Sequence, residues 1–191
     1  MFTTQLFQSQ SLLLEPYDPE KDAAVEAGFT RRWDYAWGTA LGGEPHPISA
    51  FQVKKKREEQ LKRIAESRDS FLFAVRLRDD QQFIGVLELP WVSWPNRMTW
   101  MKALIGDESL EAKHLAEVLK MGLRYAFEEL DMAVVASSTG EFQPQVLKTC
   151  LDLGMQIQVR QRQMVFSQGK YWDRLILSMA QTEWKTRNSE E

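Results

Sequence analysis

Two side chains in this sequence are candidates for proton transfer, the carboxyl of Glu88 and the thiol of Cys150. Glu88 lies in an apolar run, where burial would raise its pKa toward the range of a general base, although the residue alternation also allows it to face solvent. Cys150 is the only cysteine. A thiol with its reference pKa of about 8.5 can donate a proton, but a lone cysteine is more commonly a small buried residue of a helix.

The two histidines, His46 and His114, do not form a metal-binding pair. They are too far apart in the sequence, and no acidic cluster completes a ligand set around either one. We therefore expect no metal site. Trp91, Trp94 and Trp100 could form the floor of a substrate pocket. More commonly, such aromatic side chains pack in turns and in the core.

The hydrophobic pattern predicts an α/β fold of seven strands and four helices around these side chains. Apolar residues recur at helical spacing from 115 to 130, so this helix must face a sheet. The apolar run after it lacks polar alternation and predicts a buried strand parallel to its predecessor. The predicted strands are 11–15, 71–75, 83–89, 98–105, 132–136, 155–166 and 171–179, and the predicted helices are 19–32, 49–67, 109–130 and 143–153.

Three further segments have compositions that predict their environment. Residues 33–47 are rich in Trp, Gly and Pro and predict an irregular connection whose aromatic side chains pack or line a cleft. The basic run 54–57 predicts a solvated helix face, and the polar residues 185–191 predict a tail.

Length and composition narrow the class of protein. A chain of 191 residues with 43% hydrophobic content can bury one substantial core, so residues 1–191 are expected to form a single domain. The net charge of −3 with scattered basic residues argues against a nucleic-acid partner. One cysteine, no signal-like N-terminus and no long apolar run favour a cytoplasmic protein that neither crosses nor binds a membrane.

The C-terminal part of the sequence carries the most specific resemblance. Its residues Gly169-Lys170-Tyr171-Trp172-Asp173, the strand after them and Glu183-Trp184 resemble the closing hairpin of the GNAT N-acetyltransferase superfamily, in the subgroup that acetylates N-termini of ribosomal proteins. Phe83-Ile84-Gly85 and Leu153-Gly154-Met155 agree with it. The resemblance implies a GNAT-like mixed sheet of about seven strands with about four helices.

This resemblance also implies an activity, in which acetyl-CoA donates an acetyl group to a primary amine by direct attack in a ternary complex. The acceptor would be a small molecule or a protein N-terminus, and a homodimer would be compatible with the family. Leu104, Ile105 and Gly106 would lie along pantetheine. Gln143 would contact the cofactor, and Cys150 would protonate the leaving thiolate.

The family's phosphate-binding loop corresponds to residues 111–116, which are Glu111, Ala112, Lys113, His114, Leu115 and Ala116. The family places Arg or Gln first, Gly fourth and Gly or Ala sixth, so only Ala116 matches. Glu111 would bring a negative charge toward the pyrophosphate, and His114 would crowd a backbone that glycine leaves open. These departures leave a second hypothesis open, a GNAT-fold binding module with weak or no CoA binding.

Overall fold

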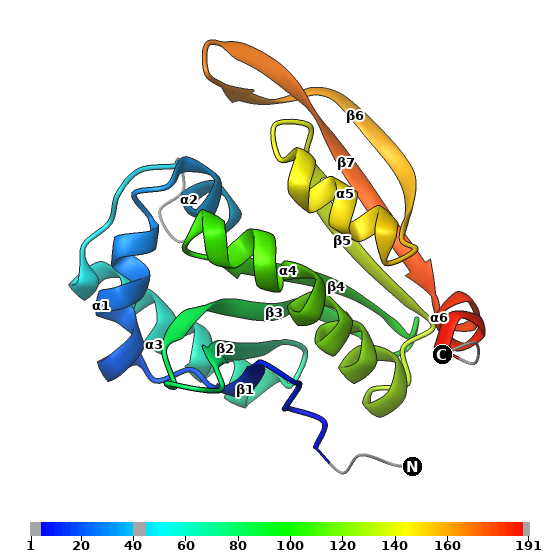
Figure 1. Ribbon diagram of the computed structural model, residues 1–191, viewed down its shortest axis with the longest axis horizontal. Coiled ribbons are helices and arrows are strands. Elements are labelled where there is room, and N and C mark those ends of the chain that lie inside the picture. The colour runs from blue at the N-terminus through cyan, green and yellow to red at the C-terminus, as the bar shows by residue number, and fades with distance from the viewer. Residues whose placement is uncertain (1–4, 40–44, 189–191) are drawn as a thin grey trace.

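The computed structural model describes residues 5–39 and 45–188, and in these ranges the chain forms one sheet with helices on both faces (Figure 1). The strands are β1 (Leu12–Pro16), β2 (Phe71–Leu77), β3 (Phe83–Ser93), β4 (Met98–Ile105), β5 (Val134–Gly140), β6 (Gln156–Ser167) and β7 (Lys170–Ala180). The α-helices are α1 (Pro19–Phe29), α2 (Trp33–Thr39), α3 (Ala50–Ser67), α4 (Glu108–Arg124), α5 (Pro144–Asp152) and α6 (Gln181–Asn188), and a π-helical turn, η1 (Tyr125–Glu129), continues α4.

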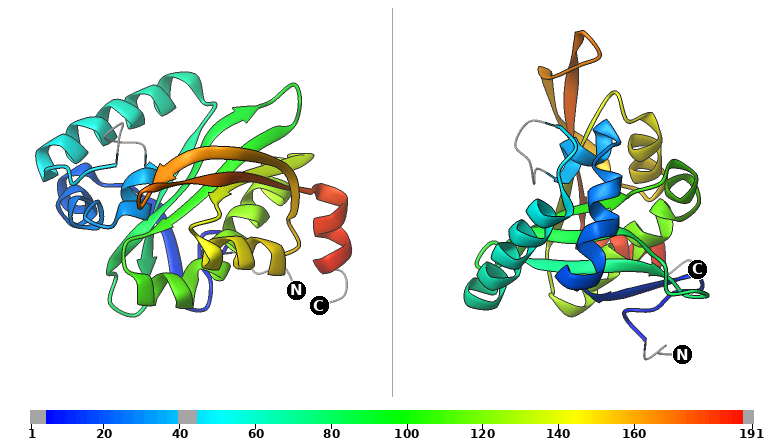
Figure 2. Two further views of the ribbon diagram at one scale, coloured as in Figure 1. Left: turned by 90° about the horizontal axis from the view of Figure 1, so that it is seen from above. Right: turned by 90° about the vertical axis from the view of Figure 1, so that its left-hand side faces the viewer.

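The sheet has the strand order β1-β2-β3-β4-β5-β7-β6. All neighbouring strands are antiparallel except β4 and β5, which α4 connects as a parallel pair. In Figure 2, right, α1 and α3 lie on one side of the sheet and α4 and α5 on the other. The expected α/β architecture with a seven-stranded mixed sheet is confirmed.

Strands β4 and β5 are paired over only three residues at their starts, where Met98, Thr99 and Trp100 face Val134, Val135 and Ala136. Beyond this point the two strands diverge (Figure 1). A register shift between Glu88 and Trp91 in β3 marks a bulge at the same level, and Pro90 within it lacks the N–H that a regular ladder requires. Because a bulge increases local twist, it accounts for β4 bending away from β5.

Helix α4 packs its apolar stripe against the sheet, as its periodicity predicts. Leu115, Val118, Leu119 and Leu123 are all buried in the main core. The helix begins early because Asp107 caps it, accepting hydrogen bonds from the backbone N–H groups of Ser109 and Leu110. This capped end lies beside the gap between β4 and β5, so the fold places a helix N-terminus next to the diverging strands.

Several sequence predictions differ from the structure. The segment 33–47 was expected to be irregular, but Trp33–Thr39 forms α2; residues 40–44 lie outside the described part. The expected tail begins inside α6, of which Lys185 is part, so the described helices number six rather than four. Strand β5 extends to Gly140 instead of ending at 136, because it stays paired with β7 as far as Gly140 and Arg174. Its second half is polar, so the sequence has no apolar run there.

The basic run on α3 does not lie entirely on a solvated face. Arg57 is completely buried, and its guanidinium donates hydrogen bonds to the carboxylates of Glu26 and Glu88. Tyr17 and Tyr35 also donate to Glu26. A buried arginine is tolerated when carboxylates satisfy its donors, and this network ties α1 and α3 to β3.

None of the helices in the described ranges is both long and apolar enough to span a bilayer.

Candidate functional site

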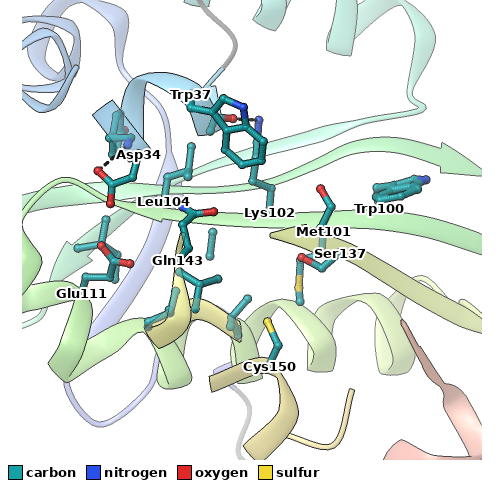
Figure 3. Close-up of a pocket in the computed structure, with 18 of the residues that line it drawn as sticks. Asp34, Trp37, Trp100, Met101, Lys102, Leu104, Glu111, Ser137, Gln143 and Cys150 are labelled. Carbon is teal, nitrogen blue, oxygen red and sulfur yellow. Dashed lines mark hydrogen bonds between the residues drawn. The ribbon is translucent and has the colours of Figure 1, made fainter. Parts of the chain in front are cut away.

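A cavity of about 590 Å³ lies where β4 and β5 separate (Figure 3). Its walls come from β3, β4, β5 and β7 and from α2, α4 and α5. Leu104, Ile105, Glu111, Leu115, Gln143 and Cys150, six of the residues expected from the sequence to act at a site, line it. These six residues, from Leu104 to Cys150, span about a quarter of the sequence, and the fold brings them to one cavity.

The strand register divides the cavity into two sides. Trp100 is paired with Ala136, so Lys102 and Ser138, each two residues further along, point to the same face of the sheet. That face is the one covered by α3, because Lys102 is paired with Glu88, which bonds Arg57 of α3. In Figure 3, Lys102 lies on the side of Trp37 and Cys150 lies on the opposite side of β4.

Cys150 forms part of the wall on the α4 and α5 side. Its side chain is buried beside the apolar residues Leu115 and Leu119 of the same lining. Burial raises the pKa of the thiol to about 11, above the reference value assumed from the sequence. The thiol therefore keeps its proton at neutral pH.

The outer end of the cavity carries two carboxylates that share one cation. The guanidinium of Arg32 bonds Asp34 at 3.1 and 2.5 Å and Glu111 at 2.7 Å. It also donates to the backbone oxygen of Ile105 at 3.3 Å. Burial raises the pKa of Glu111, although Arg32 acts in the opposite direction. The negative charge of Glu111 is thus partly compensated within the protein.

A second cavity of about 290 Å³ adjoins this end and shares Asp34, Glu111, Gln143 and Val146 with the first. Glu108 and Pro144, the first residues of α4 and α5, are in its lining. Two helix N-termini therefore face one space, and each has the partial positive charge that favours an anion.

Residues 111–116 are not a loop, as the sequence comparison with the family had suggested, but the first turns of α4. The N–H of Glu111 already donates to the oxygen of Asp107 at 2.8 Å. Ala112 borders the smaller cavity, whereas Lys113 and Ala116 are exposed and border neither. Backbone N–H groups inside a helix bond its own carbonyls, and Asp107 already accepts from the N–H groups of Ser109 and Leu110 at the start of α4, so an anion there would compete with this cap.

His114 faces away from both cavities. It is buried with its Nδ1 atom 3.3 Å from the hydroxyl of Ser11, while its Nε2 atom has no hydrogen-bond partner among the described residues. The expectation that this imidazole crowds a phosphate site is therefore wrong. The side chain instead fills the space between α4 and the segment that precedes β1.

Gly106 has its N–H bonded to the oxygen of Ile84 at 2.9 Å, so this amide is not available to a cofactor. A Cβ atom at this position would lie 2.1 Å from the ring of Phe29. The glycine therefore allows α1 to pack closely against the end of β4. Neighbouring Leu104 and Ile105 line the cavity itself.

Glu88 is buried but is not poised as a base. Its carboxylate bonds Arg57 at 2.6 Å and lies 3.2 Å from Nζ of Lys102. Burial alone would raise its pKa, but the charges of Lys102 and Arg57 outweigh this and lower it to about 2. Both sequence hypotheses, a raised pKa and a solvent-facing side chain, are wrong, because sequence alone did not show that Arg57 is buried beside it.

Among the residues of the site that sequence reasoning missed are two acid–base partners at the outer end, Arg32 and Asp34, and two cations further inside, Lys102 and Arg174. Arg32 and Asp34 flank the start of α2, in or next to the segment expected to be irregular. The expectation that aromatic residues there pack or line a cleft is nevertheless confirmed by Trp37, which lines the cavity together with Trp91 and Trp100. No group of three potential metal ligands occurs within residues 5–39 and 45–188.

Comparisons with known proteins agree with this geometry. The family profile described as "Acetyltransferase (GNAT) domain" matches residues 11–156. No curated protein sequence matches the chain. The solved structures described below share 15–17% identity with the chain and are therefore informative about the fold.

Three of these structures illustrate the likeness. The spermidine N-acetyltransferase from Vibrio cholerae in complex with CoA and spermine has a TM-score of 0.77 and 15% identity, covering 93% of this chain and 99% of that chain. A dodecameric structure of the same enzyme has a TM-score of 0.74 and 15% identity, covering 94% and 99%. A structure described as a probable acetyltransferase has a TM-score of 0.77 and 17% identity, covering 92% and 96%.

Proposed function

This chain belongs to the acetyltransferase (GNAT) domain family, and from that membership we propose that it transfers an acetyl group from acetyl-CoA to a primary amine. The observation that carries the proposal is the cavity between the diverging strands β4 and β5. A ligand inserted there can reach both faces of the sheet. Donor and acceptor can thus approach each other from opposite sides and react directly in a ternary complex.

The donor side is the one that faces α4 and α5. Beyond Trp100 the β5-facing edge of β4 is not paired with a strand among the described residues, so its backbone beside Leu104 can bond the amides of pantetheine, while the oxygen of Ile105 accepts from Arg32. The pyrophosphate would then lie in the smaller cavity, at the starts of both helices. A CoA-bound relative of the same fold supports this choice of donor.

Arg32 answers the main objection to CoA binding. Glu111 and Asp34 would repel a pyrophosphate if they stood alone, but both already bond this guanidinium. Arg32 also borders the smaller cavity. The altered residues in 111–116 therefore do not by themselves favour the binding-module hypothesis, and transferase activity is the function we propose.

Acetyl transfer requires a neutral amine to attack the thioester carbonyl and a proton for the thiolate that leaves. The C–N bond forms as the C–S bond breaks, and the amine loses its extra proton to water. In this proposal Cys150, which lines the cavity, donates the proton to the leaving thiolate, and solvent then replaces the proton of Cys150. Glu88 is too weak a base at its lowered pKa, so no side chain is assigned as general base.

The acceptor can be a small amine or a protein N-terminus. The resemblance of the closing hairpin to the subgroup that acetylates ribosomal proteins favours the protein N-terminus. Two of the three solved structures named above are of a spermidine N-acetyltransferase, whose acceptor is a small amine. Both kinds of acceptor are primary amines and are compatible with the proposed reaction. We also propose that the chain forms an oligomer, with a homodimer as the simplest case, and the dodecameric relative supports measuring its mass in solution.

Calorimetric titration with acetyl-CoA at two salt concentrations tests the proposal. Saturable binding in the micromolar range, followed by amine-dependent release of free CoA thiol, is the expected result. Binding should respond to salt because charged groups surround the smaller cavity. If millimolar acetyl-CoA does not bind, the chain is a non-catalytic module and the search turns to protein partners.

A further inference from the structure

The acceptor side of the cavity is cationic, and we propose that the amine substrate carries a carboxylate that Arg174 and Lys102 bind. This inference rests on the proposed acetyl transfer and specifies its substrate class. It separates this chain from polyamine acetylation, because a polycation would meet like charge at the wall that it must approach.

The charges on the cavity wall are unevenly distributed. Its four charged residues are Asp34, Glu111, Lys102 and Arg174. The two carboxylates lie at the outer end and share Arg32. The two cations come from strands β4 and β7, further inside, so an acceptor that enters from the α2 and α3 side meets positive charge.

Arg174 has an unmet hydrogen-bonding need. It is paired with Gly140 in the sheet and therefore shares the face of Ser138 and Lys102. Its Nη2 atom donates to the hydroxyl of Ser138 at 3.2 Å, but its Nε atom is buried without a partner among the described residues. A buried donor on a charged group is costly to leave unpaired, and a carboxylate can accept from Nε and Nη2 together.

Lys102 provides the second cation. Its Nζ atom donates to the backbone oxygen of Gly38 at 2.7 Å and lies 3.2 Å from Glu88. An ammonium has three N–H groups, so one remains for a ligand. Because Glu88 also bonds the buried Arg57, its charge is shared and does not fully cancel that of Lys102.

Aromatic side chains complete this side of the cavity. Trp37, Trp91 and Trp100 line it together with the two cations. Flat apolar walls beside a cationic end suit a small amine with an aromatic body and a carboxylate, such as an aromatic amino acid. A long polyamine has neither feature.

The test compares ligand pairs that differ only in the carboxylate. Tryptophan and tryptamine form one pair, phenylalanine and phenethylamine a second, and spermidine represents polycations. Each is titrated into protein saturated with acetyl-CoA or CoA, and acetylation is followed by thiol release. We expect the acid of each pair to bind about 10-fold or more tightly than its amine, and spermidine to bind weakest.

Substitution of Arg174 locates the effect. Arg174→Gln should raise KM for the preferred acid about 10- to 100-fold and abolish its advantage over the matched amine, while kcat and the affinity for acetyl-CoA change little. Arg160→Gln is the control, because Arg160 is an exposed arginine on β6 that pairs with Glu141 and Asp173 outside the cavity. Lys102→Gln should act in the same direction as Arg174→Gln.

The outcomes separate the two proposals. If acetyl-CoA binds but no acid binds more tightly than its matched amine, or spermidine is preferred, the carboxylate inference is wrong and the transferase proposal stands. If Arg174→Gln weakens acetyl-CoA instead of the acid, Arg174 belongs to the donor site. If acetyl-CoA itself does not bind, the proposed function fails first.

Discussion

Arg32 donates a hydrogen bond of 2.7 Å to Glu111 across the gap between the start of α2 and the first turn of α4. The two residues are far apart in the sequence. The net charge at the outer end of the cavity depends on both of them. Asp34 bonds the same guanidinium, so one cation serves two acids. The local charge that a pyrophosphate would meet therefore depends on this triad.

Glu111→Gln should tighten acetyl-CoA binding. The change removes one of the two acids and releases Arg32 toward the pyrophosphate, which at this partly solvated position corresponds to a gain of about 1 kcal/mol, or roughly fivefold in Kd. Titration calorimetry at low and high salt measures it, with the larger effect at low salt. Glu58→Gln, on the outer part of α3, is the control. An unchanged Kd would remove Glu111 from the donor site.

Cys150→Ala should lower kcat by about 100-fold while the affinity for acetyl-CoA stays nearly constant, since general acid catalysis is typically of this size. Because the pKa of the thiol is raised to about 11, its proton should stay in place from pH 6 to 9. The rate of alkylation by iodoacetamide should accordingly be slow. Thr149→Val, at the neighbouring buried position of α5, controls for packing. An unchanged kcat in Cys150→Ala would show that Cys150 is a core residue without a catalytic role.

Glu88→Gln should destabilise the fold by about 3 kcal/mol at neutral pH, because it leaves the buried Arg57 short of a carboxylate. The folded-state pKa of Glu88, about 2, lies below the ordinary value of 4.5. The ionised group therefore stabilises the fold above pH 4.5, and this contribution is lost as the pH falls toward 2. Urea unfolding from pH 7 to 3 should show that the difference in free energy of unfolding between wild type and variant becomes smaller as the pH falls.

The same variant tests catalysis by Glu88. If the folded fraction retains the wild-type dependence of kcat/KM on pH, Glu88 is a structural residue, as its ion pairs indicate. Loss of an ionisation near neutral pH in the variant would instead make it the base. Glu129→Gln, an exposed position after α4, provides the comparison for stability.

His114→Gly restores the residue type that the family has at this place, yet it should not improve acetyl-CoA binding. The imidazole faces Ser11 and the N-terminal segment and borders neither cavity. Its removal leaves a void and adds a glycine to a helix interior, which alone costs about 1 kcal/mol. Thermal unfolding should therefore show a lower Tm with an unchanged Kd. A tighter Kd would show that His114 reaches the donor site after all.

Much of the fold was accessible from local patterns. The stripe from Leu115 to Phe127 predicted the helix that covers the sheet, and the apolar run after it predicted a parallel strand. These signals are strong because burial of one face imposes a period on the sequence. The second half of β5 escaped prediction, since Ser137 and Ser138 border a cavity and the usual apolar signal of a buried strand is absent there.

The sequence by itself determined the order of most elements, which follows from periodicity, and carried local motifs that resemble the family; that resemblance in turn implied six of the residues that meet at the cavity. Only the tertiary structure decided how the charged side chains of the site are paired and how their pKa values shift. The charges of Lys102 and the buried Arg57 lower the pKa of Glu88, and Arg32 partly compensates the charge of Glu111. Electrostatic energies depend on distance and burial between groups that are remote in sequence, and neither quantity exists before the chain is folded.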